Sequence, residues 1–79
     1  MDMRGLVGRN LLKIRLEKGL SQEELAARAG FNQHYISEME AGKRNPTITS
    51  LYEIAEGLGV EPVELVKFTE GAKPKRRKR

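Results

Sequence analysis

Several polar side chains and two basic ones lie between residues 33 and 45, in the middle of the chain. An amide side chain can donate a hydrogen bond to a phosphate oxygen or pair with the N6 and N7 atoms of adenine. Lysine and arginine neutralise phosphates and release counterions. The residues of this stretch that could do such chemistry are Gln33, His34, Tyr35, Ser37, Glu38, Lys43, Arg44 and Asn45. Whether they act together depends on the elements that position them.

The sequence lacks the residues that catalysis or metal binding requires. The chain has one histidine and no cysteine, which excludes disulfides, thiolate zinc sites and cysteine nucleophiles. His34 therefore has no second ligand for a metal and no partner nucleophile; it contacts a base or a phosphate, or it is a neutral surface histidine. There is no glycine-rich phosphate loop and no implied pocket of paired carboxylates. We expect no enzymatic activity, no cofactor and no small-molecule ligand.

The basic residues that produce the formal net charge of +4 are unevenly distributed along the chain. Residues 73–79 hold six of the fifteen basic residues, so residues 1–72 hold nine basic and eleven acidic residues and carry a net charge of −2. Because like charges repel and no apolar residue occurs after Ala72, we predict one domain over residues 1–70 and a disordered basic tail over residues 71–79. The tail could add phosphate affinity, bind a partner or do nothing specific, and we favour phosphate affinity.

The length of 79 residues indicates a single small domain, which buries only about 60% of its unfolded surface and gains from a partner subunit. No apolar run is long enough to cross a membrane, and residues 1–9 lack the apolar stretch of a signal peptide. We expect a cytoplasmic protein that does not contact a membrane.

Apolar spacing predicts a first helix over residues 6–18. Val7, Leu11 and Ile14 follow the i, i+4, i+7 pattern of a helix with one buried face. Gly19 is expected to end this helix in the left-handed conformation.

Two shorter helices follow, joined by a short turn that begins with a glycine. Ser21 caps the first, over residues 22–29, in a capping box with Glu24. Asn32 caps the second, over residues 33–41. Such a pair is a helix-turn-helix arrangement, in which the second helix can lie in the major groove of DNA while the first crosses the backbone.

Two further helices complete an all-α prediction of five. Thr47 caps the fourth, and Gly57 and Gly59 mark its end. Pro62, at a first helical position, opens the fifth. The fourth helix is expected to bury Ile48, Leu51, Ile54, Ala55 and Leu58, and the fifth carries Val63, Leu65, Val66 and Phe68.

Three stretches of the chain carry a family resemblance: LEKGLSQEELAARAG at 16–30, YISEMEAGKRNP at 35–46 and LYEIAEGLGV at 51–60. They resemble the lambda-repressor and Cro type of helix-turn-helix protein, also called the XRE family of prokaryotic regulators. The resemblance covers about residues 7–66, in the order and spacing of the family. It implies a compact five-helix domain and a sequence-specific transcriptional regulator, a repressor or an activator, that binds double-stranded DNA.

The resemblance implies roles for two glutamines. In the family, the glutamine that opens the first helix of the motif binds a phosphate and touches the glutamine that opens the recognition helix. Those positions are Gln22 and Gln33 here. An amide suits both roles, because it donates to phosphate and pairs with adenine. The alternative is that both glutamines are only exposed polar residues.

Other residues of the recognition helix keep two interpretations. Ser37 and Glu38 lie one turn beyond Gln33 on the same face. Glu38 could accept a hydrogen bond from cytosine N4, or it could repel phosphate and disfavour wrong registers. Tyr35 donates its phenolic hydrogen to a phosphate or packs across the motif, and we favour the phosphate.

The resemblance also implies that the loop containing Lys43, Arg44 and Asn45 lies against the sugar–phosphate backbone, the alternative being a solvated loop. It further implies a partly buried ion pair of Arg15 and Glu40, which orients the recognition helix and does not contact DNA. Near the start of the first helix, Arg4, Arg9 and Asn10 could meet an adjacent phosphate or serve as an arm.

Apolar residues near the C-terminal end of the domain predict a homodimer. Val60, Val63, Val66 and Phe68 exceed what the core of a four-helix domain needs. The alternative is a monomer whose fifth helix covers the core. A two-fold dimer would place its recognition helices about 34–36 Å apart on an inverted-repeat site. The alternative function is that of a protein–protein adaptor or antitoxin with the same fold.

Overall fold

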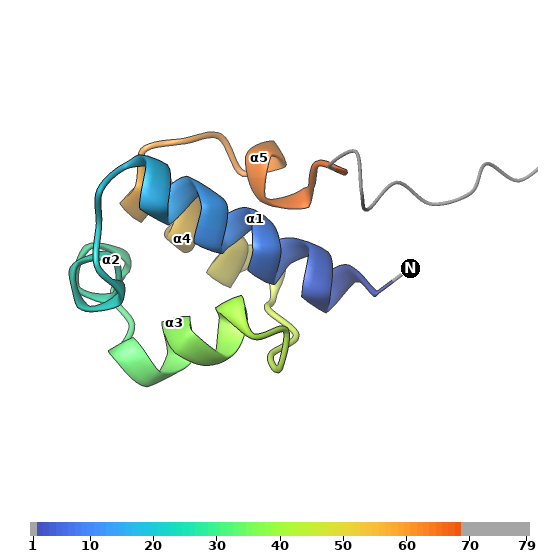
Figure 1. Ribbon diagram of the computed structural model, residues 1–79, viewed down its shortest axis with the longest axis horizontal. Coiled ribbons are helices and arrows are strands. Elements are labelled where there is room, and N and C mark those ends of the chain that lie inside the picture. The colour runs from blue at the N-terminus through green and yellow to red at the C-terminus, as the bar shows by residue number, and fades with distance from the viewer. Residues whose placement is uncertain (1, 69–79) are drawn as a thin grey trace, which may run out of the picture.

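The computed structural model describes residues 2–68 as five α-helices (Figure 1). The helices are α1 (Met3–Glu17), α2 (Gln22–Ala29), α3 (Gln33–Glu40), α4 (Ile48–Leu58) and α5 (Val63–Val66). The predicted all-α, five-helix fold is confirmed, whereas the predicted tail over residues 71–79 lies outside the described residues. Within residues 2–68, no helix has the length and apolar character needed to cross a membrane.

Side-chain caps explain where four of the helices begin. The side chains of Ser21, Asn32 and Thr47 each accept a hydrogen bond from the backbone N–H three residues later, as predicted. The predicted capping box at Ser21 is complete. The start predicted for the first helix is wrong by three residues, because Asp2 accepts a hydrogen bond from a backbone N–H of the first turn and α1 begins at Met3.

The core draws fully buried side chains from every helix. The helix α1 packs against α3 on one side and α5 on the other, while α4 packs against α2 (Figure 1). Burying an aliphatic side chain of this size contributes about 1.5–3 kcal/mol, so these contacts contribute strongly to the stability of the fold. The largest fully buried side chains are those of Leu6, Leu11, Leu25, Ile36, Met39, Ile54 and Leu65.

Two glycines allow helices to pack with their backbones close together. A Cβ atom at Gly8 would lie 2.5 Å from the carbonyl oxygen of Met39, so α1 tolerates no larger residue where it crosses α3. The prediction that Gly57 marks the end of the fourth helix is wrong. Gly57 lies inside α4, where a Cβ would sit 3.1 Å from the Cβ of Ala29. The helix ends at Gly59, whose φ is 75°.

The predictions for Ile48 and for the fifth helix need correction. Ile48 is 86% exposed, because it occupies the first turn of α4, which the other helices leave uncovered. Pro62 is the N-cap residue of α5, and the backbone becomes extended at Lys67. Phe68 therefore follows the helix and is exposed.

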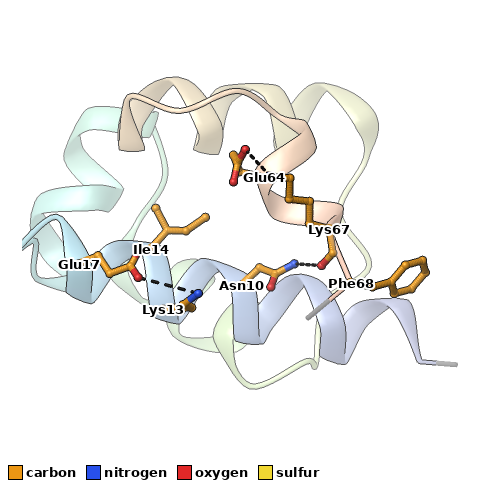
Figure 2. Close-up of a pocket in the computed structure, with 7 residues that line it drawn as sticks. All are labelled: Asn10, Lys13, Ile14, Glu17, Glu64, Lys67 and Phe68. Carbon is orange, nitrogen blue, oxygen red and sulfur yellow. Dashed lines mark hydrogen bonds and ion pairs between the residues drawn. The ribbon is translucent and has the colours of Figure 1, made fainter. Parts of the chain in front are cut away.

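A buried amide fastens α5 to α1. Asn10 donates hydrogen bonds to the carbonyl oxygens of Leu65, at 2.9 Å, and Lys67, at 2.8 Å. Figure 2 shows the bond to Lys67 at the floor of a groove between α1 and α5, beside the ion pair of Glu64 and Lys67. The prediction that Asn10 meets phosphate is wrong, because its side chain is buried and already satisfies two backbone carbonyls.

Candidate nucleic-acid interface

The turn between α2 and α3 sets the angle at which α3 leaves the core. Gly30 adopts a φ of 83°, and the N–H groups of Gly30 and Phe31 both donate to the carbonyl oxygen of Ala26. Asn32 then caps α3 at once. Ile36 and Met39 bury the inner face of α3, so its opposite face points to solvent. The exposed side chains on α3 and in the loop after it include Gln33, His34, Ser37, Lys43, Arg44 and Asn45.

The two glutamines singled out in the sequence lie in contact. Gln33 is exposed and donates from Nε2 to Oε1 of Gln22 at 3.3 Å. Gln22, which is half-buried, in turn donates from Nε2 to Oε1 of Glu40 at 2.9 Å. The amide at the start of α3 is therefore oriented by a side chain of α2.

A buried ion pair supports these glutamines, because Gln22 donates to its carboxylate. The side chains of Arg15 and Glu40 are 11% and 7% exposed, and Arg15 donates from Nε and from Nη2 to the two oxygens of the carboxylate. Arg15 Nη1 also donates to the carbonyl oxygen of Leu20 at 2.8 Å. The pair ties α1 to α3, and a charge buried to this extent needs such full compensation. A continuous chain of polar contacts thus runs from Arg15 through Glu40 and Gln22 to Gln33.

A second cluster connects α3 to the loop that follows it. Arg44 Nε donates to Oε1 of Glu38 at 2.8 Å, and His34 Nε2 lies 3.3 Å from Oε2 of the same carboxylate. The hydrogen bond from Arg44, together with the charges of His34 and Lys43, holds the pKa of Glu38 below its ordinary value despite some desolvation. Glu38 is therefore an anion whose two oxygens both face a basic group.

An aromatic stack lies beside this cluster. The rings of Phe31 and Tyr35 are nearly parallel, with centroids 4.4 Å apart, and the Arg44 guanidinium carbon lies 4.9 Å from the centroid of the Tyr35 ring. Tyr35 thus packs across the motif, which was the second of its two interpretations. Sequence reasoning missed Phe31, because it lies in the turn before α3 and its contact with Tyr35 depends on the course of that turn.

The four apolar residues predicted for a dimer seam differ in exposure. Val63 is 52% exposed and Phe68 is 44% exposed, whereas Val60 and Val66 pack partly against the core. All four come from the segment that contains α5. In Figure 1 this segment lies on the opposite side of α1 from α3.

Comparison with known proteins identifies the family. A profile described as helix-turn-helix matches residues 11–65. An HTH-type transcriptional regulator of Sinorhizobium fredii, y4dJ, is 59% identical over 70 residues, which cover 89% of this chain and 91% of that protein. The control protein C.BamHI of Bacillus amyloliquefaciens is 39% identical over 69 residues, which cover 86% of this chain and 85% of that protein.

A solved structure agrees with this assignment. The crystal structure of the restriction-modification controller protein C.AhdI from Aeromonas hydrophila matches with a TM-score of 0.76 and 37% identity, over 78% of this chain and 94% of that one. Because the family profile spans more than half of the residues and the relatives cover most of the chain, this chain belongs to the helix-turn-helix family of DNA-binding transcriptional regulators, as its sequence resemblance indicated.

Proposed function

We propose that this regulator reads a specific double-stranded DNA site with α3 in the major groove and binds that site as a homodimer, on the nucleoid in the cytoplasm. The observation that carries the proposal is the chain of contacts that leads from the buried Arg15 and Glu40 pair to Gln33 at the exposed start of α3. Such supporting contacts hold a base-contacting side chain in one orientation before DNA binds. The residues proposed to contact DNA are Gln22, Gln33, His34, Ser37, Lys43, Arg44 and Asn45. Two residues that the sequence also suggested, Tyr35 and Glu38, pack against Arg44 instead.

Base reading is proposed for the exposed turns of α3. Gln33 uses one N–H to reach Gln22, and its amide retains a further N–H and its carbonyl oxygen for the edge of a base. Ser37 lies one turn further along the same exposed face and donates or accepts a single hydrogen bond. These positions carry sequence preference.

Phosphate binding is proposed for the loop after α3, and Lys43 provides its test. Lys43→Ala should weaken binding to all duplexes by a similar factor and reduce the slope of log K against log salt by about one, because one fewer counterion is released. Lys13→Ala is the charge-matched control, since Lys13 lines the groove between α1 and α5 (Figure 2). Titration of a labelled duplex at several salt concentrations measures both slopes. Equal slopes for the two variants would show that Lys43 does not contact a phosphate of the duplex.

The homodimer is proposed to form through Val60, Val63, Val66 and Phe68. Val63→Asp places a charge on the exposed part of this surface and should convert a dimer to a monomer in sedimentation equilibrium, with much weaker binding to an inverted repeat. Leu16→Asp is the control, because Leu16 is 62% exposed on α1 and lies outside this segment. If the wild-type protein is monomeric at micromolar concentration, the result supports the alternative, in which α5 only covers the core.

A salt titration separates the proposed regulator from an adaptor. The regulator should bind an inverted-repeat duplex with an affinity that falls steeply as salt rises, whereas an adaptor with this fold should bind duplexes weakly and without sequence preference. The measurement needs the wild-type protein, the preferred duplex and a scrambled duplex of equal length. Equal affinities for the two duplexes at every salt concentration would contradict the proposal.

A further inference from the structure

We propose that Glu38 is a positioning residue, which holds the Arg44 guanidinium against the Tyr35 ring so that Arg44 meets one DNA phosphate in a fixed geometry. The inference rests on the proposed function and assigns the way in which Glu38 serves it. Glu38 acts through Arg44 and does not read a base.

The geometry places Arg44 between two partners on α3. Its Nε donates to Glu38 at 2.8 Å, and its guanidinium carbon lies 4.9 Å from the Tyr35 ring centroid. Tyr35 is itself stacked on Phe31, which comes from the turn before α3. The loop after α3 is therefore joined to the helix by a carboxylate and an aromatic ring.

These contacts order the Arg44 side chain before it binds an anion. A long arginine side chain that is ordered before binding loses less conformational freedom when the complex forms. The bond to Glu38 uses the N–H on Nε, and the guanidinium carries four more N–H groups on its two Nη atoms. Those groups form the fork that suits a phosphate.

The contacts of Glu38 disfavour its two sequence-based roles. Oε1 accepts from Arg44, and Oε2 lies 3.3 Å from His34 Nε2, so both oxygens already face basic groups. A carboxylate whose Oε1 already accepts a hydrogen bond from Arg44 is less free to turn toward cytosine N4. Its repulsion of phosphate is also reduced, because the adjacent Arg44 compensates its charge.

A charge-matched pair of variants tests the proposal. Glu38→Gln and Glu38→Ala both remove the negative charge, but only glutamine keeps an oxygen that accepts from Arg44 Nε. On the duplex selected by the wild-type protein, Glu38→Ala should bind about three- to tenfold more weakly than Glu38→Gln, the cost of ordering one flexible side chain. In an Arg44→Ala background the two should bind equally. Both should select the same site as the wild-type protein.

Other outcomes would overturn the proposal in distinguishable ways. Equal binding of the two Glu38 variants when Arg44 is present would show that the hydrogen bond from Arg44 to position 38 does not contribute to DNA binding. A difference that persists without Arg44, with a changed preferred base, would show that position 38 reads DNA. A wild-type protein that prefers no duplex sequence would contradict the proposed function itself.

A measurement on the wild-type protein does not depend on whether the variants fold. In the free protein, the Nε–H proton of Arg44 should exchange with solvent more slowly than that of Arg9, which is an exposed arginine of α1. Nitrogen-15 spectra of the arginine side chains measure both rates. Equal exchange would mean that Glu38 does not hold Arg44.

Discussion

Glu40→Ala is expected to lower the free energy of unfolding by about 3–5 kcal/mol, the usual effect of removing one partner from a buried ion pair. Glu40 is 7% exposed at its side chain and accepts hydrogen bonds from Arg15 and Gln22. Its loss leaves the Arg15 guanidinium without a counter-charge at a buried position. Because a small domain has only about 5–15 kcal/mol of stability in total, a loss of this size removes a substantial part of it and should clearly lower the urea concentration at which the variant unfolds.

Urea unfolding followed by circular dichroism measures this effect. Glu53→Ala is the matched control, because Glu53 is an exposed glutamate of α4 and should change stability by about 0.5 kcal/mol or less. The double variant Arg15→Met with Glu40→Leu removes both charges and should recover much of the loss. A loss below about 1 kcal/mol for Glu40→Ala would mean that the buried pair does not support the fold as described.

Gln33→Ala is expected to reduce the affinity for the preferred DNA site by about 1–3 kcal/mol, which is roughly 5- to 150-fold. The variant loses the amide that pairs with a base, and the neighbouring Gln22 loses its contact from Gln33. Affinity for unrelated duplexes should change little, because phosphate contacts from the loop after α3 remain. Specificity at one base position should therefore relax.

Competition binding with duplexes that vary one base pair at a time measures this loss. Gln33 is exposed, so the variant should unfold at the same urea concentration as the wild-type protein, and that equality is the control. Ser37→Ala, on the next turn of the same exposed face, should alter a different base position. If Gln33→Ala retained both the preferred site and its affinity, Gln33 would not be the leading reading residue.

Local features of the fold could be predicted because their determinants are close together in the sequence. The cap at Ser21 depends on a residue three positions away, and Gly19, Gly30 and Gly59 adopt the positive φ that ends a helix. The apolar period of α1 and the bounds of α2 follow from the same short-range chemistry. The pairing of Gln22 with Gln33 was expected only through the family resemblance.

The remaining features depend on contacts between residues that are distant in the sequence. Asn10 is an ordinary polar residue until α5 brings two carbonyl groups to it, 55 and 57 positions away. Gly57 resembles a helix end, but it lies inside α4 where α2 passes so close that a Cβ would crowd Ala29. Ile48 fits the apolar pattern, yet the neighbouring helices do not extend over it. The engagement of Arg44 by Glu38 and Tyr35 likewise requires the course of the loop after α3.

Selection of bound duplexes from a random pool, followed by sequencing, tests the central claim most directly. The wild-type protein should enrich one inverted repeat whose half-sites are about one helical turn apart, as expected for two recognition helices related by a two-fold axis. Gln33→Ala should enrich a version with one relaxed position in each half-site. Enrichment of no sequence by the wild-type protein would contradict the assignment of α3 as a helix that reads DNA.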